Sequence, residues 1–298
     1  MERRNFIRNA GLSAGLLALT PKDLLASFFQ QPAYQLTPLR NDVGFFTEKG
    51  GTIVYYLSKE GIVVVDTEFP DPAKHLIDEL KKQNDKPFKF LINTHHHGDH
   101  TGGNIAFKGL AEHVVGHENC LANYVRVATE QKSEDKQLFQ DITFKDTWTA
   151  KVGKEKIKAH YFGAGHTNGD AIIHFEHANI AHMGDLMFNK MYPYIDPKAG
   201  ASFKSWVNVL DKALSTFNND TIFVFGHASK NVVTGTKEDL KGMKNYVEQV
   251  LTLVSKQIKE GKSKDEILKI TSIPNVGEWA DEAKRIQSNL EAAYNELI

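Results

Sequence analysis

A dense run of metal-binding side chains constrains this chain more than any other feature of its sequence. Within six positions it carries His95, His97, Asp99 and His100, with a glycine in the middle. A regular helix cannot direct all four to one point, because residues two apart on a helix point about 200° away from each other. An extended chain would place the first three on one side, and the fourth would face away unless the chain bends. We therefore predict a loop that leaves a strand at 88–93 and bends at its glycines.

The donor types in this loop suit a transition metal. Neutral imidazole and carboxylate oxygen favour zinc, and they favour iron or manganese less selectively. Clustered histidines are also found as accidental surface residues or in expression tags, but a tag sits at a terminus. This cluster lies mid-chain, directly after an apolar strand. We interpret it as a metal site, and we give no metal role to His96, which points away from His95 in an extended chain.

Four further segments carry a histidine or an aspartate directly after a predicted strand. They are Asp66 after 62–65, His166 within Gly-Ala-Gly-His-Thr, Asp185 closing His-Met-Gly-Asp, and His227 after Phe-Val-Phe-Gly. In this order, and together with the spacing His95-x-His97-x-Asp99-His100, they resemble the signature of the metallo-β-lactamase superfamily. The resemblance spans about residues 34 to 230.

The resemblance implies a role for each of these residues. One metal would be held by His95, His97 and His166, and a second by Asp99, His100 and His227. Asp185 would bridge the two, which suits metals about 3.5–4 Å apart, and Asp66 would hold a ligand loop in place. The best-known lactamases of the superfamily mostly carry Cys or Ser at the bridging position. Asp there resembles the thioesterase, lactonase, phosphodiesterase and hydroxyacylglutathione-hydrolase-like branches.

Charge counting indicates what such a site would do. Two divalent ions bring four positive charges, and Asp99, Asp185 and a bridging hydroxide remove three, so the centre stays positive. It would bind carbonyl or phosphoryl oxygens that become anionic, and it would use water whose pKa the metals lower to about 7. Asp99 is the predicted catalytic residue, because its carboxylate can orient this hydroxide and pass its proton to the leaving group.

For the fold, the resemblance implies an α/β (α+β) structure: a four-layer αββα sandwich of two mixed β-sheets with helices outside, plus C-terminal helices. The residue pattern predicts strands at 34–39, 43–47, 52–57, 61–66, 88–93, 142–149, 157–162, 170–175 and 180–185. It predicts helices from Asp71, over 117–129 and over 203–217, with mixed helical structure between the metal loop and residue 140. Capping sequences at Thr236 and Ser263 open the C-terminal helices. We assign the sandwich to residues 28–235, and interpret 236–298 as helices packed on that domain rather than a separate substrate domain.

The specificity of the site is less constrained than its metals. The loop 187–196 is aromatic. It either lines the substrate groove, with Asn189, Lys190 and Tyr192 as substrate-binding residues, or packs as a rim on the following helix. Many lactamases use a Lys three residues beyond the Cys ligand to bind the carboxylate of the drug. Phe188 stands at that position here, and Lys190 is a candidate replacement.

The N-terminus carries an export pattern. Arg3 and Arg4 precede Phe-Ile, a mildly apolar run follows at 10–19, and small residues stand at Ala26 and Ser27. The run is too short to span a bilayer, which needs about 20 apolar residues. We predict a twin-arginine signal over residues 1–27 and an exported, periplasmic protein. An ordinary secretory signal or an uncleaved anchor is the alternative.

Composition limits the partners. Lysine and arginine total 36 against 37 acidic residues, a formal net charge of −1. This balance argues against a nucleic-acid partner, which usually needs a basic face. We expect a small-molecule substrate and no membrane contact beyond the export signal, and the oligomeric state stays open. The single cysteine, Cys120, cannot form an intrachain disulfide and is predicted to be a buried thiol. His182 is interpreted as a core residue rather than a neighbour of the metals.

These patterns favour one function and leave two alternatives open. The favoured hypothesis is an exported hydrolase with two zinc ions that cleaves an ester, thioester, lactone or related bond. A β-lactamase would use the same chemistry on a different substrate. An iron-dependent oxidoreductase, similar to the persulfide dioxygenases of the superfamily, would use the same ligands with another metal, because the sequence does not separate zinc from iron. A structural metal site is disfavoured, since such sites are usually closed by four ligands and rich in Cys.

Overall fold

The structure, a computed structural model, describes residues 34–280 and 285–298. Residues 36–298 form one compact unit. The predicted signal, residues 1–27, lies outside the described residues, so the export prediction stays a prediction. Within the described ranges, no helix combines the length and the apolar character that crossing a membrane would require.

The first sheet contains seven strands in the order of the sequence. They are β1 (Gln35–Pro38), β2 (Val43–Thr47), β3 (Ile53–Ser58), β4 (Gly61–Val65), β5 (Phe88–Ile92), β6 (Ala111–His117) and β7 (Ile142–Phe144). Strands β2 to β4 run antiparallel, and β4 to β7 run parallel. Every residue of β4 is buried, as its unbroken apolar sequence requires for a strand covered on both faces.

The second sheet has the strand order β15-β13-β11-β10-β9-β8. Its strands are β8 (Thr147–Val152), β9 (Glu155–His160), β10 (Ile172–Phe175), β11 (Ile180–His182), β13 (Ile222–Val224) and β15 (Thr234–Gly235). Strands β11 and β13 run parallel, so their carboxyl ends meet at the same edge of this sheet. At that edge a short parallel pair forms between β12 (Phe188–Asn189) and β14 (His227–Ala228).

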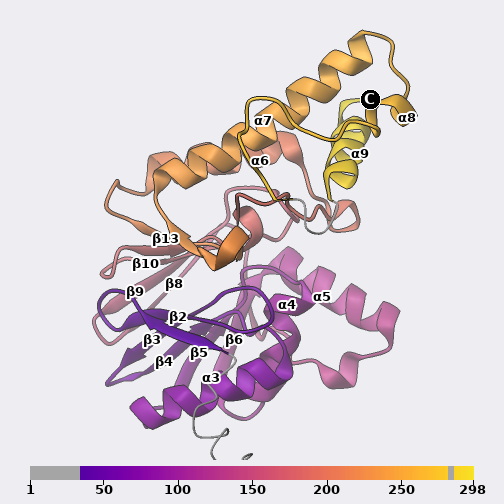
Figure 1. The fold of residues 1–298 in the computed structure, drawn as a ribbon. Helices are drawn as coiled ribbons and strands as arrows, with labels where there is room; N and C mark the ends of the chain where they lie inside the picture. Colours follow the sequence, from indigo (N-terminus) through magenta and orange to yellow (C-terminus); the bar gives the residue numbers. More distant parts are fainter. Residues whose placement is uncertain (1–33, 281–284) are drawn as a thin grey trace, which may run out of the picture. The chain divides into compact units, whose positions relative to one another are not determined.

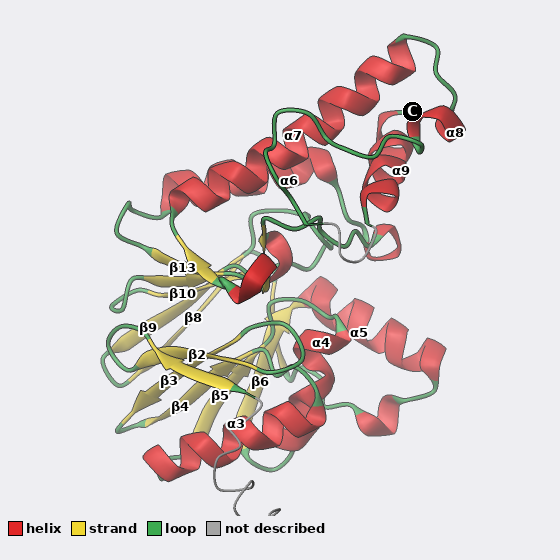
Figure 2. Cartoon of the chain, viewed as in Figure 1, coloured by secondary structure: helices red, strands yellow, loops and turns green. Residues whose placement is uncertain are grey.

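The two sheets face each other, and helices cover their outer faces (Figures 1 and 2). Apolar side chains from both sheets meet between them, among them Val54, Val63, Ile173 and Phe175. Helices α3 (Pro70–Gln83) and α5 (Glu118–Gln131) lie on the side of the first sheet, and α6 (Phe203–Thr216) and α7 (Lys237–Lys259) on the side of the second. The predicted αββα sandwich of two mixed sheets is therefore confirmed.

Short helices fill the connections, and two predicted segments differ from the structure. The short elements are α4 (Gly98–Thr101), η1 (Gly102–Phe107), η2 (Glu134–Lys136), η3 (Gly184–Leu186), η4 (Pro197–Ala199) and η5 (Ser229–Asn231). Residues 111–117 were predicted within mixed helical structure, but they form the strand β6. Only the second half of β6 is buried. Its first half is polar, so the apolar pattern is too short to predict a strand from the sequence. Residues 142–149, predicted as one strand, divide into β7 and β8, because the chain passes from one sheet to the other near residue 145.

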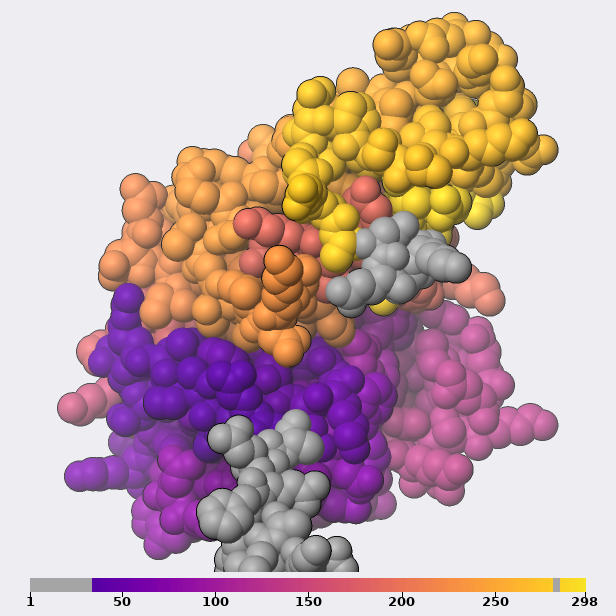
Figure 3. Space-filling model, in the orientation of Figure 1, coloured from indigo at the N-terminus to yellow at the C-terminus, as the bar shows by residue number. Residues whose placement is uncertain are grey.

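The C-terminal helices begin where their capping sequences predict. Thr236 and Asp239 form a capping box at the start of α7, and Ser263 and Glu266 form another before α8 (Lys264–Ile267). The last helix, α9 (Ile286–Leu297), packs with α6 and α7 on the apolar cluster outside the second sheet. Figure 3 shows the yellow C-terminal residues lying against the orange segments that precede them.

Candidate metal centre

All the predicted metal ligands follow strands that end at one edge of the sandwich. In the first sheet, β5 ends three residues before His95. In the second sheet, β11 ends three residues before Asp185, and β13 ends three residues before His227. Because β11 and β13 are parallel neighbours, the segments after them emerge side by side.

One group of donor atoms comes from His95, His97, His166 and Asp185, and these atoms all lie within 4.8 Å of one another. Nδ1 of His97 is 3.1 Å from Nε2 of His95 and 2.8 Å from Nε2 of His166. Oδ2 of Asp185 is 3.4 Å from Nε2 of His166 and 3.8 Å from Nε2 of His95. Three imidazole nitrogens and one carboxylate oxygen thus face a common point, which is the number of ligands that a tetrahedral metal takes.

A second group contains Asp99, His100 and His227. Nε2 of His227 lies 3.0 Å from Oδ2 of Asp99 and 3.4 Å from Oδ2 of Asp185. The other oxygen of Asp185 lies 3.1 Å from Nε2 of His100. The carboxylate of Asp185 therefore reaches both groups, and the seven predicted ligands form two adjoining clusters.

The loop that carries the motif differs locally from its predicted form. His95, His96 and His97 are irregular, but Gly98–Thr101 forms the short helix α4. Neighbouring residues on a helix point about 100° apart, which lets Asp99 and His100 flank the same point. Asp99 consequently joins the second group rather than aligning with His95 and His97 on one side of an extended chain.

The buried polar atoms of the site fit a metal cation. The side chain of Asp185 is 4% exposed, and that of His100 is fully buried. Although their facing atoms are 3.1 Å apart, Nε2 of His100 and Oδ1 of Asp185 have no hydrogen-bond partner among the described residues. Nitrogen and oxygen donors that converge without satisfying each other are expected where a cation completes the site. Cys120 belongs to neither group; it is buried, as predicted, and accepts a hydrogen bond from Gln140 at 3.5 Å.

The imidazoles of the two groups differ in their protonation. Burial lowers the pKa of His95 well below its usual range and lowers the pKa of His166 to about 3, so both are neutral and keep a lone pair for a metal. Burial acts in the same direction on His227, but the carboxylate of Asp185 outweighs it and raises that pKa to about 9. In the metal-free protein, a proton on the second group therefore supplies part of the positive charge that a metal cation would bring.

Asp66, the residue predicted to hold a ligand loop, lies directly behind His100. One of its oxygens accepts hydrogen bonds from Nδ1 of His100 at 2.8 Å and from the Thr94 hydroxyl at 2.7 Å. The other accepts the backbone N–H of Thr94 at 2.8 Å. His182, interpreted from sequence as a core residue, is fully buried but also comes within 3.3 Å of Asp66. Asp66 thus fixes the His100 ring so that its Nε2 faces the other donor atoms of the second group.

Asp196 plays the corresponding part for His97, and the sequence pattern did not indicate this role. Its Oδ2 lies 3.0 Å from Nε2 of His97, which leaves Nδ1 to face the first metal group. Burial would raise the pKa of Asp196, but the hydrogen bond with His97 lowers it to about 2. His96 lies 3.7 Å from the same oxygen. Asp196 stands before a proline and also caps η4 through the N–H of Ala199, which is the role its local sequence suggests.

Glu68 was also missed, and it holds a loop at the rim of the centre. Its carboxylate accepts the backbone N–H groups of Glu48, Lys49 and Gly50 at 2.7–2.9 Å. This fixes the β2–β3 turn, in which Gly51 lies so close to the His100 ring that a Cβ at this position would overlap it. A side chain at position 51 would therefore displace a predicted metal ligand.

The aromatic loop 187–196 contacts the predicted metal ligands through two of its residues. Phe188 stacks on His227 with ring centroids 5.2 Å apart, and the Tyr194 ring is 5.4 Å from that of His97. Tyr192 instead stacks on Tyr246 at 5.5 Å, because a backbone pairing between Met191 and Ala280 turns this part of the loop toward the C-terminal helices. Tyr194, rather than the predicted Tyr192, therefore lies next to the imidazoles of the predicted metal ligands.

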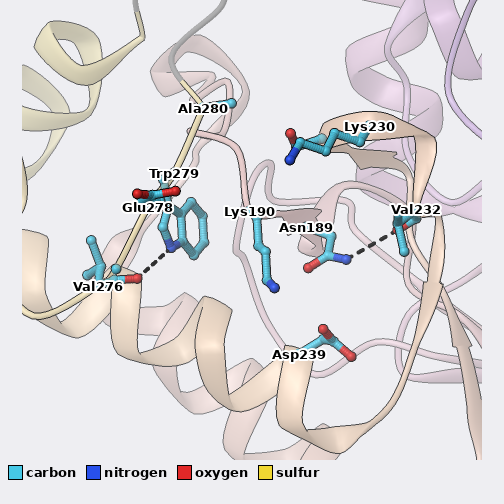
Figure 4. A pocket seen from close by; sticks show the side chains of 11 residues that line it. Asn189, Lys190, Lys230, Val232, Asp239, Val276, Glu278, Trp279 and Ala280 are labelled. Carbon is cyan, nitrogen blue, oxygen red and sulfur yellow. Dashed lines mark hydrogen bonds between the residues drawn. The ribbon is translucent and has the colours of Figure 1, made fainter.

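The other two predicted substrate residues line a separate cavity of about 700 Å³ (Figure 4). Asn189 is 7% exposed, and its amide donates to the carbonyl of Val232 at 3.2 Å. Lys190 extends into the cavity opposite Asp239, and Trp279 forms one wall. Phe188 and Asn189 are adjacent on β12, and neighbouring strand residues point to opposite faces. Since Phe188 faces His227, Asn189 faces away from it.

Comparison with known proteins identifies the family. The model of the metallo-β-lactamase superfamily matches residues 47–227, well over half of the chain, and the chain belongs to this family. The chain is 23% identical over 201 residues to a metallo-β-lactamase type 2 of Elizabethkingia meningoseptica, covering 67% of this chain and 78% of that protein. It is 22% identical to metallo-β-lactamase IND-1 of Chryseobacterium indologenes, covering 70% and 80% respectively. Membership supports a metal-dependent hydrolase.

Solved structures agree on the fold. A metallo-β-lactamase from Pontibacter korlensis matches with a TM-score of 0.60 and 22% identity, covering 72% of this chain and 99% of that one. The DIM-1 metallo-β-lactamase also matches with a TM-score of 0.60, at 18% identity, covering 74% and 99%. The neighbours are thus matched over nearly their whole length, and about a quarter of this chain lies outside each match.

We predict that Asp66→Asn weakens zinc binding. The carboxylate of Asp66 now accepts a hydrogen bond from Nδ1 of His100. An amide could turn its N–H groups toward this donor instead, so the His100 ring would lose its fixed orientation. Zinc affinity should fall about 10–100-fold, as for other residues that orient metal ligands. Competition with a chromophoric chelator measures this, and Asp78→Asn, an exposed aspartate on α3, is the control. Equal zinc affinity in the two variants would contradict the role of Asp66.

We also predict that zinc stabilises the protein more at high pH. The pKa of His227 in the folded, metal-free protein is about 9, against 6.5 as the ordinary value. Protonated His227 therefore contributes stability that is present below about pH 6.5 and lost as the pH rises through 9. Zinc replaces this charge, so the rise in Tm on adding two equivalents of zinc should be larger near pH 9 than near pH 6. A larger rise near pH 6 would contradict the assignment.

Proposed function

We propose that this protein is a hydrolase with two zinc ions that cleaves an ester, thioester, lactone or related bond. The observation that carries the proposal is the position of Asp185, whose two oxygens lie 3.1 Å from His100 and 3.4 Å from His166 and His227. A carboxylate that reaches both ligand groups suits a pair of metals that share one bridging ligand. Imidazole and carboxylate donors without a thiolate suit zinc, and they also admit iron or manganese.

The residues of the chain would have distinct tasks around such metals. Two bound divalent metals would supply a water of low pKa and a positive site for a carbonyl oxygen. Asp99 is the more exposed of the two predicted carboxylate ligands, at 31% against 4% for Asp185. Burial would raise the pKa of Asp99, but the neighbouring His100 holds it well below its usual range. An ionised carboxylate at the open side of the site can accept a proton and deliver it to the leaving group.

A β-lactamase is the second candidate, favoured by the names of the relatives in Elizabethkingia and Chryseobacterium. Two residues argue against it as the first choice. Asp185 stands where lactamases mostly have Cys or Ser, and Phe188 stands where many have a carboxylate-binding Lys. Phe188 is 1% exposed and stacked on His227, so this position offers no charge to a substrate.

Export through the twin-arginine route is proposed from the sequence alone. The support is the Arg3-Arg4 pair ahead of a weak apolar run. We predict that replacing both arginines with lysine keeps the protein in the cytoplasm, because the route requires the arginine pair. Fractionation of cells that express the two forms measures this. Periplasmic protein at an unchanged level would point to the general secretory route instead.

We predict that Asp99→Asn abolishes turnover while the fold survives. An amide binds a metal poorly and cannot take up a proton, so kcat/KM should fall by at least about 10²–10⁴-fold. Circular dichroism and zinc content test whether the variant is folded and loaded. Asp85→Asn, an exposed aspartate, is the matched control. An active Asp99→Asn variant with full metal content would remove Asp99 from the mechanism.

The decisive experiment combines metal analysis with a substrate panel. Protein purified without a metal column should contain two zinc ions per chain, and one tightly held iron with no zinc would favour the oxidoreductase. On one zinc-loaded preparation, kcat/KM should be clearly higher for activated esters, thioesters or lactones than for cephalosporins and carbapenems. A β-lactam turned over at about 10⁵ M⁻¹s⁻¹ or faster, with esters and thioesters far slower, would establish the lactamase instead.

A further inference from the structure

His96 is a buried histidine that belongs to neither of the two ligand groups described above. Its side chain is 1% exposed, and neither of its ring nitrogens has a hydrogen-bond partner among the described residues. A neutral imidazole offers one N–H donor and one acceptor nitrogen, and leaving both unsatisfied in a buried position costs free energy. Unpartnered nitrogens of this kind are expected where a ligand completes a site.

The ring of His96 lies beside a carboxylate and a second imidazole. Nε2 of His96 is 3.7 Å from Oδ2 of Asp196, and Nε2 of His97 is 3.0 Å from the same oxygen. One donor atom from each of these three residues lies within 4.8 Å of the others. A tetrahedral zinc ion with bonds of about 2.0–2.2 Å places its ligand atoms about 3.4 Å apart. The two measured separations lie on either side of this value, so His96, His97 and Asp196 form an outer group with the spacing of metal ligands.

Contacts outside the outer group hold its members in place. Oδ1 of Asp196 accepts the backbone N–H of Ala199 at 3.1 Å, which leaves Oδ2 to face the two imidazoles. The hydroxyl of Thr101 donates to the carbonyl oxygens of His96 and His97 at 3.1 and 3.0 Å, and so fixes the backbone that carries both rings. Ligands that are already positioned lose little conformational entropy on binding. The side chains of His97 and Asp196 are 17% and 13% exposed, so an ion can reach the group from solvent.

We propose that His96, His97 and Asp196 bind a third transition-metal ion, of the zinc class, beside the two-metal centre. Two imidazoles and a carboxylate are a donor set that zinc accepts, and three protein ligands leave a fourth position for water. This site goes beyond the hydrolase function, because it does not depend on the bond that the centre cleaves. It also revises the prediction from the sequence, which gave no metal role to His96.

His97 couples the third ion to the first ligand group. Its Nδ1 faces His95 of that group, and its Nε2 faces Asp196. When a metal occupies Nδ1, Nε2 carries a proton that Asp196 accepts. The third ion forms its bond to Nε2 as this N–H bond breaks and the proton passes to solvent, so the ring then bridges two metals as an imidazolate. The lost proton opposes binding, and the third ion therefore binds more weakly than the other two and is taken up only from excess zinc.

The test is equilibrium dialysis of the metal-free protein against increasing excess zinc, with bound zinc measured by elemental analysis. At saturation, His96→Phe should hold one zinc ion fewer per chain than wild type, because only the third ion needs His96. Competition with a chromophoric chelator should give equal affinities for the first two ions in both proteins. Calorimetry in two buffers with different enthalpies of ionisation should show about one proton released as the last ion binds to wild type.

Matched variants separate metal binding from structural effects. His160→Phe is the control, because His160 in β9 is also buried with an unpartnered Nε2 but belongs to no candidate metal group of the described residues. It should keep the wild-type number of ions. His96→Asn should lose the same ion as His96→Phe without inserting a larger ring. Equal zinc content at saturation in wild type and both His96 variants would overturn the proposal, and so would weaker binding of the first two ions in both variants, which would assign a structural role to His96.

Discussion

The carboxylate of Asp185 lies where four imidazoles meet, and the arrangement of this edge of the sandwich depends on it. Its oxygens lie 3.1–3.8 Å from nitrogens of His95, His100, His166 and His227. Burial alone would raise the pKa of Asp185, but His227 and His100 hold it well below its usual range. A buried carboxylate is costly unless opposite charge compensates it. The strand ends therefore meet at a buried negative charge. Only cations, whether protons on imidazole or metal ions, can balance this charge.

The same constraint explains the polar contacts behind the ligands, because an imidazole can direct one nitrogen to a metal only if the other is fixed. Nδ1 of His100 bonds Asp66, and Nε2 of His97 bonds Asp196. Nδ1 of His166 lies 2.7 Å from the carbonyl of Tyr194. In each case the remaining nitrogen faces a ligand group. A partner that accepts N–H also selects the neutral tautomer with its lone pair toward the metal.

These partners show which parts of the site a sequence can reveal. The predicted ligands could be located in the sequence because each follows a strand at short range, and a strand is recognisable from its local apolar pattern. The sandwich was predictable for the same reason, except at β6, where only half of the strand is buried. Asp196 is 99 residues from His97 along the chain, and only the folded loop brings them together. The local sequence of Asp196 predicts a helix cap, and Asp196 does cap η4. The sequence therefore does not distinguish this capping role from the contact with His97.

The wall of the site beside His227 depends on the same kind of long-range contact. Position 188 is 1% exposed and packed on His227, and a lysine there would pay a desolvation cost beside a ring whose pKa is already raised. The aromatic ring avoids that cost, but it leaves the wall of the site uncharged. The Arg285 guanidinium, whose Cζ lies 5.8 Å from the Phe188 ring, comes from the start of α9, outside the span that the family model matches. Because α9 is fixed through Asn289 to the loop after Asp185, the C-terminal helices and the metal centre meet at one aromatic surface.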